Sequence, residues 1–148
     1  MLRHIDYPPI WLLFALGIVW IETVLAPQLL GHALIQGFGT LTVALGVVLF
    51  ALAGWSFLRA RSTIIPHQTP QQLITTGIFR LSRNPIYLAD VLILVGLSLR
   101  WGALSGLILA PILMRVLLVR FIRPEEARIL QQFGPAAQRY FAQTRRWL

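Results

Sequence analysis

The chain has 148 residues, of which 57% are hydrophobic and only 12% are charged. Soluble domains contain about 45–50% apolar and about 25% charged residues, so this composition excludes an ordinary water-soluble globule. Because a membrane-spanning helix needs about 20 mostly apolar residues, the apolar content is sufficient for four spans but not for six.

The net charge is +8, and all 13 basic residues are arginines, against five acidic residues. The arginines stand at the ends of apolar segments, which is typical of a protein at a membrane surface and not of one that binds nucleic acid. The chain contains no cysteine, which excludes disulfides and thiolate metal sites.

Two apolar segments come first. Residues 10–26 are predicted to form an anchored span and not a cleaved signal peptide, because Glu22 interrupts the apolar run. The second span is predicted at residues 38–58, which carry no charge. Its glycines, including Gly39 and Gly46, favour close helix packing over a dinucleotide-binding loop, since no strand precedes them.

A polar loop at residues 59–84 separates these spans from two more, predicted at residues 85–99 and 101–122. Pro85 is a favourable first helical residue, and Asn84 is expected to cap that helix. The third span is short, so we expect protein to shield part of it from lipid. Arg100-Trp101 is predicted to form the tight turn between the last two spans.

The C-terminal tail predicts amphipathic helices within residues 124–146. Pro124 opens the first, Gly134 ends it and Pro135 starts the second. In the second helix an apolar face is formed by Ala137, Tyr140, Phe141 and Thr144. Three arginines are expected to reach lipid phosphates from this tail: Arg139, Arg145 and Arg146.

These segments predict one all-α domain over residues 1–148, an integral membrane bundle of four transmembrane helices with a cytoplasmic loop and C-terminal amphipathic helices. Arginines concentrate in the central loop and the tail, whereas the loop after the first span has none. The positive-inside bias therefore predicts that both termini are cytoplasmic, in the inner membrane if the source is bacterial. The oligomeric state is left open.

Three charged residues lie inside apolar segments, where such residues are functional candidates. Asp90 is about 7 Å from the start of the third span and Arg115 about 10 Å from the end of the fourth, so their depths match. They are expected either to pair with each other or to contact a ligand. Glu22 lies at another depth and is expected to reach the interface. The histidines are too scattered for a metal site, and no metal is expected.

A set of short motifs lies between about Ile64 and Trp147. It comprises an apolar stretch before a glycine (Leu73 to Gly77), then Arg83-Asn84-Pro85 with Tyr87, and later Glu125-Glu126, Phe133-Gly134 and Tyr140. In order and spacing this set resembles the isoprenylcysteine carboxyl methyltransferase family and its phospholipid N-methyltransferase relatives. The resemblance covers just over half of the chain.

The resemblance implies a membrane-embedded methyltransferase that uses S-adenosylmethionine as cofactor. Carried over by position, the cofactor contacts are Gln71, Gln72, Leu73, Ile74, Phe79, Asn84, Pro85, Ile86, Tyr87, Glu125 and Glu126. These residue types suit the ligand: a helix start offers N–H groups, a carboxylate accepts from ammonium or ribose, and aromatic rings can face adenine or a sulfonium.

The acceptor is expected to be a lipophilic molecule or lipid entering from the bilayer, held by Arg120 or Arg115 as the catalytic candidates. The family places an arginine four residues before the glutamates, whereas here that residue is Phe121. Asn84 also replaces the histidine of the isoprenylcysteine enzymes, which weakens the case for a prenylated cysteine as substrate. Carboxylate, amine and thiol acceptors all stay open.

Two other functions fit the composition. A small four-helix proton-coupled transporter would use Glu22 as its binding carboxylate. A non-catalytic membrane scaffold would retain the family's shape without its chemistry. The transporter needs little sequence outside the helices, whereas this chain devotes about a third of its length to the central loop and the tail.

Overall fold

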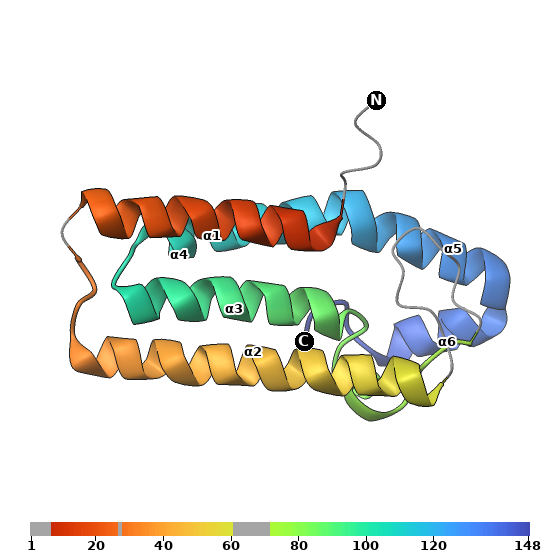
Figure 1. The fold of residues 1–148 in the computed structure, drawn as a ribbon. Coiled ribbons are helices and arrows are strands. Elements are labelled where there is room, and N and C mark those ends of the chain that lie inside the picture. The colour runs from red at the N-terminus through yellow and green to blue at the C-terminus, as the bar shows by residue number, and fades with distance from the viewer. Residues whose placement is uncertain (1–6, 27, 61–71) are drawn as a thin grey trace.

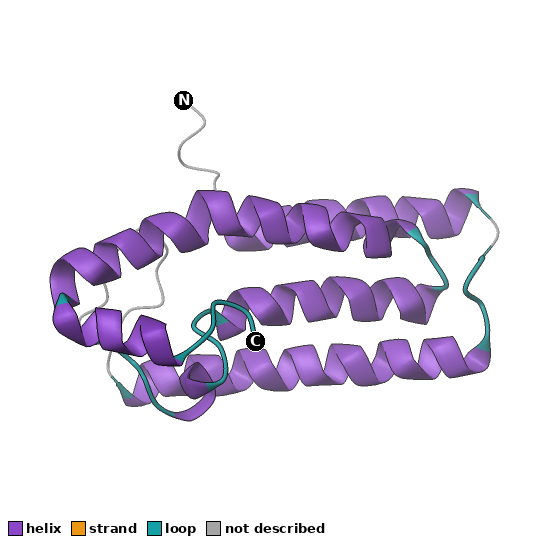
Figure 2. Cartoon of the chain, turned by 180° about the vertical axis from the view of Figure 1, so that it is seen from behind, coloured by secondary structure: helices purple, strands orange, loops and turns teal. Residues whose placement is uncertain are grey.

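The computed structural model describes residues 7–26, 28–60 and 72–148. Within these ranges the chain forms helices and connecting loops without any strand (Figure 2). The prediction of an all-α fold is therefore confirmed for the described part of the chain.

Four helices run alternately up and down along a common direction (Figure 1). They are α1 (Pro8–Leu25), α2 (Ala33–Arg59), α3 (Pro85–Trp101) and α4 (Ser105–Leu117). Three helical segments are long and apolar enough to cross a membrane: α1, α2 and the continuous helix Ser105–Phe133 that begins with α4. The 17 residues of α3 extend only about 26 Å, less than the roughly 30 Å of a hydrocarbon core.

Helix α3 occupies the centre of the bundle. It packs against α2 along its length and also contacts α1 and α4. Its core side chains, such as Leu94 and Val91, are buried, whereas α1 and α2 expose large apolar side chains outward. The expectation that protein shields the third segment is confirmed. The outward apolar side chains form the surface that lipid would cover, among them Leu13, Phe14, Trp20, Leu41 and Leu45.

Glycines let α2 and α3 approach closely. A Cβ atom on Gly46 would lie 2.9 Å from Ile93 Cγ1 and 3.1 Å from the Ala89 carbonyl oxygen. On α3, a Cβ on Gly96 would lie 2.7 Å from the Val43 backbone nitrogen. The packing interpretation of Gly39 and Gly46 is thus supported, since both are buried against α3.

Several predicted boundaries were wrong. Helix α2 begins at Ala33 and not at residue 38, because His32 Nδ1 accepts a hydrogen bond from the Leu34 N–H and starts the helix earlier. Arg100 and Trp101 do not form the turn but complete α3, which Gly102 caps with φ of +73°, so the fourth segment begins at Ser105 and not at residue 101. Glycine adopts that left-handed conformation without the Cβ clash that other residues meet.

Glu22 binds the start of α4. Its Oε1 accepts from the Leu104 N–H at 2.9 Å and its Oε2 from the Ser105 N–H at 2.8 Å. These donors belong to the first turn of α4, where N–H groups lack partners within the helix. The expectation that Glu22 merely reaches the interface was therefore wrong: the carboxylate of α1 caps α4.

The remaining helices gather at the opposite end of the bundle. The helix of α4 continues through a wider π-helical turn, Leu118–Ile122, into α5 (Arg123–Phe133), and α6 (Pro135–Gln143) then turns back (Figure 1). Gly134, with φ of +49°, forms the corner between α5 and α6, as predicted. A 3-10 turn, Gly77–Arg80, precedes α3 at this same end.

Candidate functional site

The start of α3 lies against the start of α5. The Tyr87 hydroxyl donates to Glu125 Oε1 at 2.7 Å, and the Tyr87 ring lies 6.3 Å from that of Phe121. Tyr87 is buried, with 7% of its surface exposed. Two sequence segments 38 residues apart are thus joined by one short hydrogen bond at the centre of the site.

The π-helical turn sets which side of α5 faces inward. Leu113 and Leu117 are buried before it, and Phe121 and Ile122 are buried within it. The buried Glu126 comes five residues after Phe121 and four after Ile122. A π turn adds one residue to the helical register, and after it both consecutive glutamates find partners inside the molecule.

Glu126 holds two arginines. Arg146 donates to it through Nη2 at 2.6 Å and through Nε at 3.0 Å, and Arg83 Nη1 lies 3.2 Å from its Oε1. These hydrogen bonds to Glu126 raise the pKa of Arg146, because they stabilise its charged form. Arg146 is therefore paired with Glu126 while 36% of its side chain stays exposed, and its contact with lipid phosphates stays a prediction.

The C-terminal segment after α6 lies across the start of α3. The Arg146 carbonyl accepts from Asn84 Nδ2 at 3.0 Å, and the Arg145 carbonyl accepts from the Arg83 N–H at 3.0 Å. Asn84 precedes Pro85, the first residue of α3, but its side chain does not cap the helix, which corrects the prediction. The Asn84 side-chain amide instead holds the C-terminal segment against the start of α3.

Arg83 is enclosed by these contacts. Its guanidinium carbon lies 4.4 Å from the centre of the Phe141 ring, and burial lowers its pKa from the ordinary arginine value. Glu126 opposes that shift through its negative charge. The cluster of Arg83, Glu126 and Arg146 fixes α3, α5 and the tail together.

The loop residues expected at the cofactor lie in two places. Gln71 falls outside the described residues, Gln72 is exposed, and Leu73 and Ile74 are half-buried. Phe79 is buried in the 3-10 turn, where its carbonyl accepts from the Tyr140 hydroxyl at 2.7 Å and its ring packs edge-on against Phe57 at 5.5 Å. Leu73 lines a cavity beside α6, described below.

The two candidate catalytic arginines do not lie together. Arg120, in the π-helical turn, stacks over Trp11 of α1 with 5.1 Å between the guanidinium carbon and the ring centre. Arg115 is exposed on α4, and in the described residues the structure does not pair it with Asp90. Asp90 is buried in α3 with 5% exposure, so the proposed ion pair was wrong although the depths had matched.

Sequence reasoning missed Arg128. Its Nε and Nη2 atoms are buried and have no hydrogen-bond partner among the described residues. Arg128 follows Glu125 by three residues, so the two side chains share one face of α5. That spacing was the signal in the sequence that could have identified it. A buried guanidinium with unsatisfied donors fits the carboxylate or other anionic part of a ligand.

Comparison with known proteins gives one finding. A model of the family described as phospholipid methyltransferase matches residues 34–136, which is more than half of the chain. The match includes α2, the central loop, α3, α4 and α5, and it ends just after the start of α6. No curated protein and no solved structure matches the chain significantly.

Proposed function

Because the chain belongs to the phospholipid methyltransferase family, we propose that it transfers a methyl group from S-adenosylmethionine to a lipophilic acceptor that enters from the bilayer. The family and the long apolar helices indicate an integral-membrane methyltransferase. The observation that carries the proposal is the Tyr87–Glu125 hydrogen bond, which joins the two motifs that the resemblance assigns to the cofactor.

The residues near this bond fit the methyl donor. S-adenosylmethionine, when bound, supplies a methyl group on a sulfonium, together with an ammonium, a carboxylate, a ribose and an adenine. A carboxylate such as that of Glu125, which accepts from the Tyr87 hydroxyl, is the type of group that accepts from an ammonium or a ribose hydroxyl. The unsatisfied nitrogens of Arg128 suit the carboxylate.

The protein's contribution to methyl transfer would be mainly positioning. An in-line displacement needs the acceptor and the methyl group aligned and water excluded, and little acid–base chemistry if the acceptor is already an anion. Arg120 lies five residues before Glu125 in the π-helical turn, stacked on Trp11, and is the candidate for holding an anionic acceptor. Arg115 lies about 15 Å from Glu125 along the helix axis and would contact only the outer part of such a lipid.

The transporter alternative is not favoured. It required Glu22 as an available carboxylate, whereas both of its oxygens already accept N–H groups from the start of α4. A carboxylate committed to capping is a poor carrier of protons and substrate, since each protonation would break the cap. Glu22→Gln should therefore affect stability and leave cofactor binding unchanged.

Calorimetry tests the proposal directly. Purified full-length protein in detergent, titrated with S-adenosylhomocysteine, should give saturable heat. Tyr87→Phe removes only the hydroxyl, and Glu125→Gln removes only the charge. Each should weaken binding by about tenfold, the value of one or two lost polar contacts.

The matched control is Gln131→Ala, an exposed position on the same helix as Glu125. It should bind like the wild type, and all variants should keep their helical circular dichroism. If both site variants bind normally while folded, the cofactor lies elsewhere. If the wild-type protein gives no saturable heat, the methyltransferase proposal is wrong and the scaffold hypothesis takes its place.

A further inference from the structure

Asp90 is the acidic side chain without a partner in the part of the chain that the structure describes. Glu22 caps α4, Glu125 accepts from a tyrosine, and Glu126 holds two arginines. Asp90 takes part in no hydrogen bond or ion pair among the described residues, although only 5% of its surface is exposed. Burying a carboxyl group without a partner costs free energy, so inside a membrane bundle such a group calls for a functional explanation.

Asp90 lies one helical turn further into the bundle than Tyr87. It follows Tyr87 by three residues on α3, so the two side chains share one face of the helix and are about 4.5 Å apart along its axis. The core of this part of the bundle is apolar, with Leu94 of α3 and Leu117 of α4 fully buried. Charges interact more strongly in such surroundings than in water. The Asp90 carboxylate therefore acts on a nearby charge even without touching it.

Three charged side chains act on the Tyr87 hydroxyl. The Glu125 carboxylate accepts its hydrogen bond at 2.7 Å, and the charges of Asp90 and Arg128 also interact with it. The site thus places two acidic groups and one guanidinium around the same hydroxyl. Of these groups, Arg128 also has two buried nitrogens without a hydrogen-bond partner among the described residues.

This set of charges complements S-adenosylmethionine. The methyl donor carries two cations, an ammonium and a sulfonium, and one anion, its carboxylate. In the proposed function Glu125 suits the ammonium or a ribose hydroxyl, and Arg128 suits the carboxylate. The sulfonium still needs a counter-charge. Its methyl group has to face an acceptor that enters through the apolar middle of the bundle, and Asp90 lies in that direction from Tyr87.

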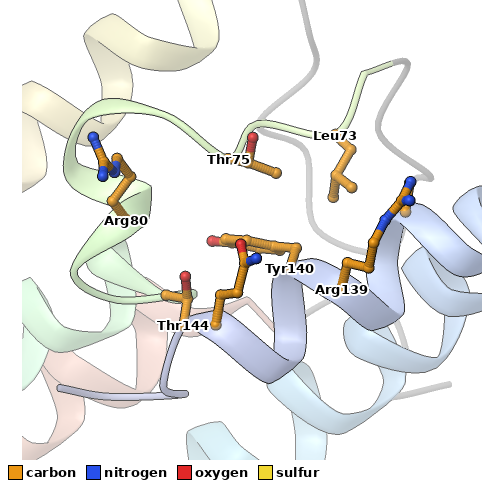
Figure 3. Close-up of a pocket in the computed structure, with 8 residues that line it drawn as sticks. Leu73, Thr75, Arg80, Arg139, Tyr140 and Thr144 are labelled. Atoms are coloured by element: carbon orange, nitrogen blue, oxygen red, sulfur yellow. The ribbon is translucent and has the colours of Figure 1, made fainter.

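The cavity beside α6 offers no counter-charge to a cation. It has a volume of about 720 Å³, and its lining includes Leu73 of the loop together with Arg80 and Arg139 at opposite edges (Figure 3). None of the described acidic residues lines it. Two arginines make it costly to place a further positive charge there. The sulfonium is therefore expected outside this cavity, toward Asp90.

From this arrangement we propose that the Asp90 carboxylate is the counter-charge of the donor's sulfonium, so that the site prefers the cationic donor to its neutral product. The proposal rests on the proposed function, because it assumes that S-adenosylmethionine binds where α3 meets α5. The product, S-adenosylhomocysteine, is a thioether without this positive charge, so its attraction to Asp90 is lost. A fresh donor molecule then replaces the product more easily.

Calorimetry with three ligands that differ at the reacting centre tests the proposal. S-adenosylmethionine and sinefungin carry a positive charge there, whereas S-adenosylhomocysteine carries none. The full-length protein in detergent is used throughout. Asp90→Asn should raise the Kd of the two cationic ligands by about tenfold or more and change that of S-adenosylhomocysteine by less than about twofold. Asp90→Glu keeps the charge and should retain most of the preference.

A further variant separates this role from a structural one. Asp90→Leu removes the unpartnered polar group from the core, so its melting temperature should equal or exceed that of the wild type. The preference for the cationic ligands should nevertheless be lost. The matched control is Glu22→Gln, which removes one negative charge at the other end of the bundle, where Glu22 caps α4. It should keep all three Kd values within about twofold of the wild type.

The outcomes distinguish this proposal from the proposed function. Equal weakening of all three ligands by Asp90→Asn would show a structural role and overturn the proposal, as would unchanged Kd values for the cationic ligands. Either result leaves the methyltransferase assignment intact as long as the wild type binds S-adenosylhomocysteine. If the wild type binds none of the three ligands, the assignment and the role of Asp90 are both wrong.

Discussion

Tyr140 shows how a single residue connects the parts of this site. It lies on α6, is 7% exposed, and donates its hydroxyl to the carbonyl of Phe79, 61 residues earlier in the chain. Burial raises its pKa to about 12, because the ionised phenolate would lose its hydration. The phenol therefore stays a donor throughout the neutral range.

We predict that Tyr140→Phe lowers stability by about 1–2 kcal/mol, since the Phe79 carbonyl loses its donor. The folded pKa is raised above the unfolded value of about 10, so this contribution is fully present below pH 10. It is lost as pH rises from about 10 to about 12. Thermal melting of both proteins across this range should show the difference between them shrinking.

The control is Tyr7→Phe, an exposed tyrosine. Its melting temperature should follow that of the wild type at every pH. A difference between wild type and Tyr140→Phe that stays constant up to pH 12 would contradict the assigned hydrogen bond.

For single residues, the sequence predicted which residues belong to the site better than which of them contact each other. The glutamate pair and Tyr87 were identified from their motif spacing, and the structure brings Tyr87 and Glu125 together. The Asp90–Arg115 pair failed because matching depth does not specify which face of a helix a side chain occupies. Glu22 was misjudged because its partners are backbone N–H groups, which have no signature in the sequence.

At the scale of elements, the contact between α2 and α3 depends on small residues. A Cβ on Gly96 would meet backbone atoms of α2, 2.7 Å from Val43 N and 2.9 Å from Gly39 O, which no side-chain rotation can relieve. We predict that Gly96→Ala destabilises the bundle by about 1–3 kcal/mol, because the two helices must separate. Thermal unfolding in detergent measures this change.

Gly54 provides the matched control on α2. A Cβ at Gly54 has no neighbouring atom within 4 Å, so Gly54→Ala should gain up to about 1 kcal/mol from helix propensity. The two glycine-to-alanine changes are thus expected to have opposite signs. If Gly96→Ala also stabilised the protein, helix propensity and not packing would govern this interface.

The elements themselves were predictable from apolar runs and from Pro and Gly punctuation, as at Pro85 and Gly134. Their ends were less predictable. The turn after α3 depends on the left-handed conformation of Gly102, and the sequence placed it two residues too early. The π-helical turn could not be predicted, since it depends on how α4 and α5 pack against the rest of the folded molecule.

At the scale of the whole molecule, the family match and the apolar helices establish a membrane protein, while its orientation stays a prediction. The chain has no cysteine, so single cysteines can report on each side. We expect Gln131→Cys on α5 to be labelled from the cytoplasmic side by a membrane-impermeant maleimide. Gln28→Cys, between α1 and α2, should be labelled from the other side. Both positions are exposed.

Leu45→Cys, on the apolar outer face of α2, serves as the control and should resist labelling in intact vesicles. Labelling of positions 28 and 131 from one and the same side would contradict the predicted topology. The number of crossings also depends on α3, which is short and enclosed by its neighbours.

The turn Leu118–Ile122 has a consequence for how this chain can vary. Each residue of an α-helix advances the side-chain direction by about 100°, so deleting one position between Leu117 and Glu125 would swing the acidic pair away from Tyr87 and Arg83. Substitutions there alter single contacts, but a change in residue count would dismantle the whole constellation at once. The number of residues in this stretch is therefore as much a part of the site as any single side chain.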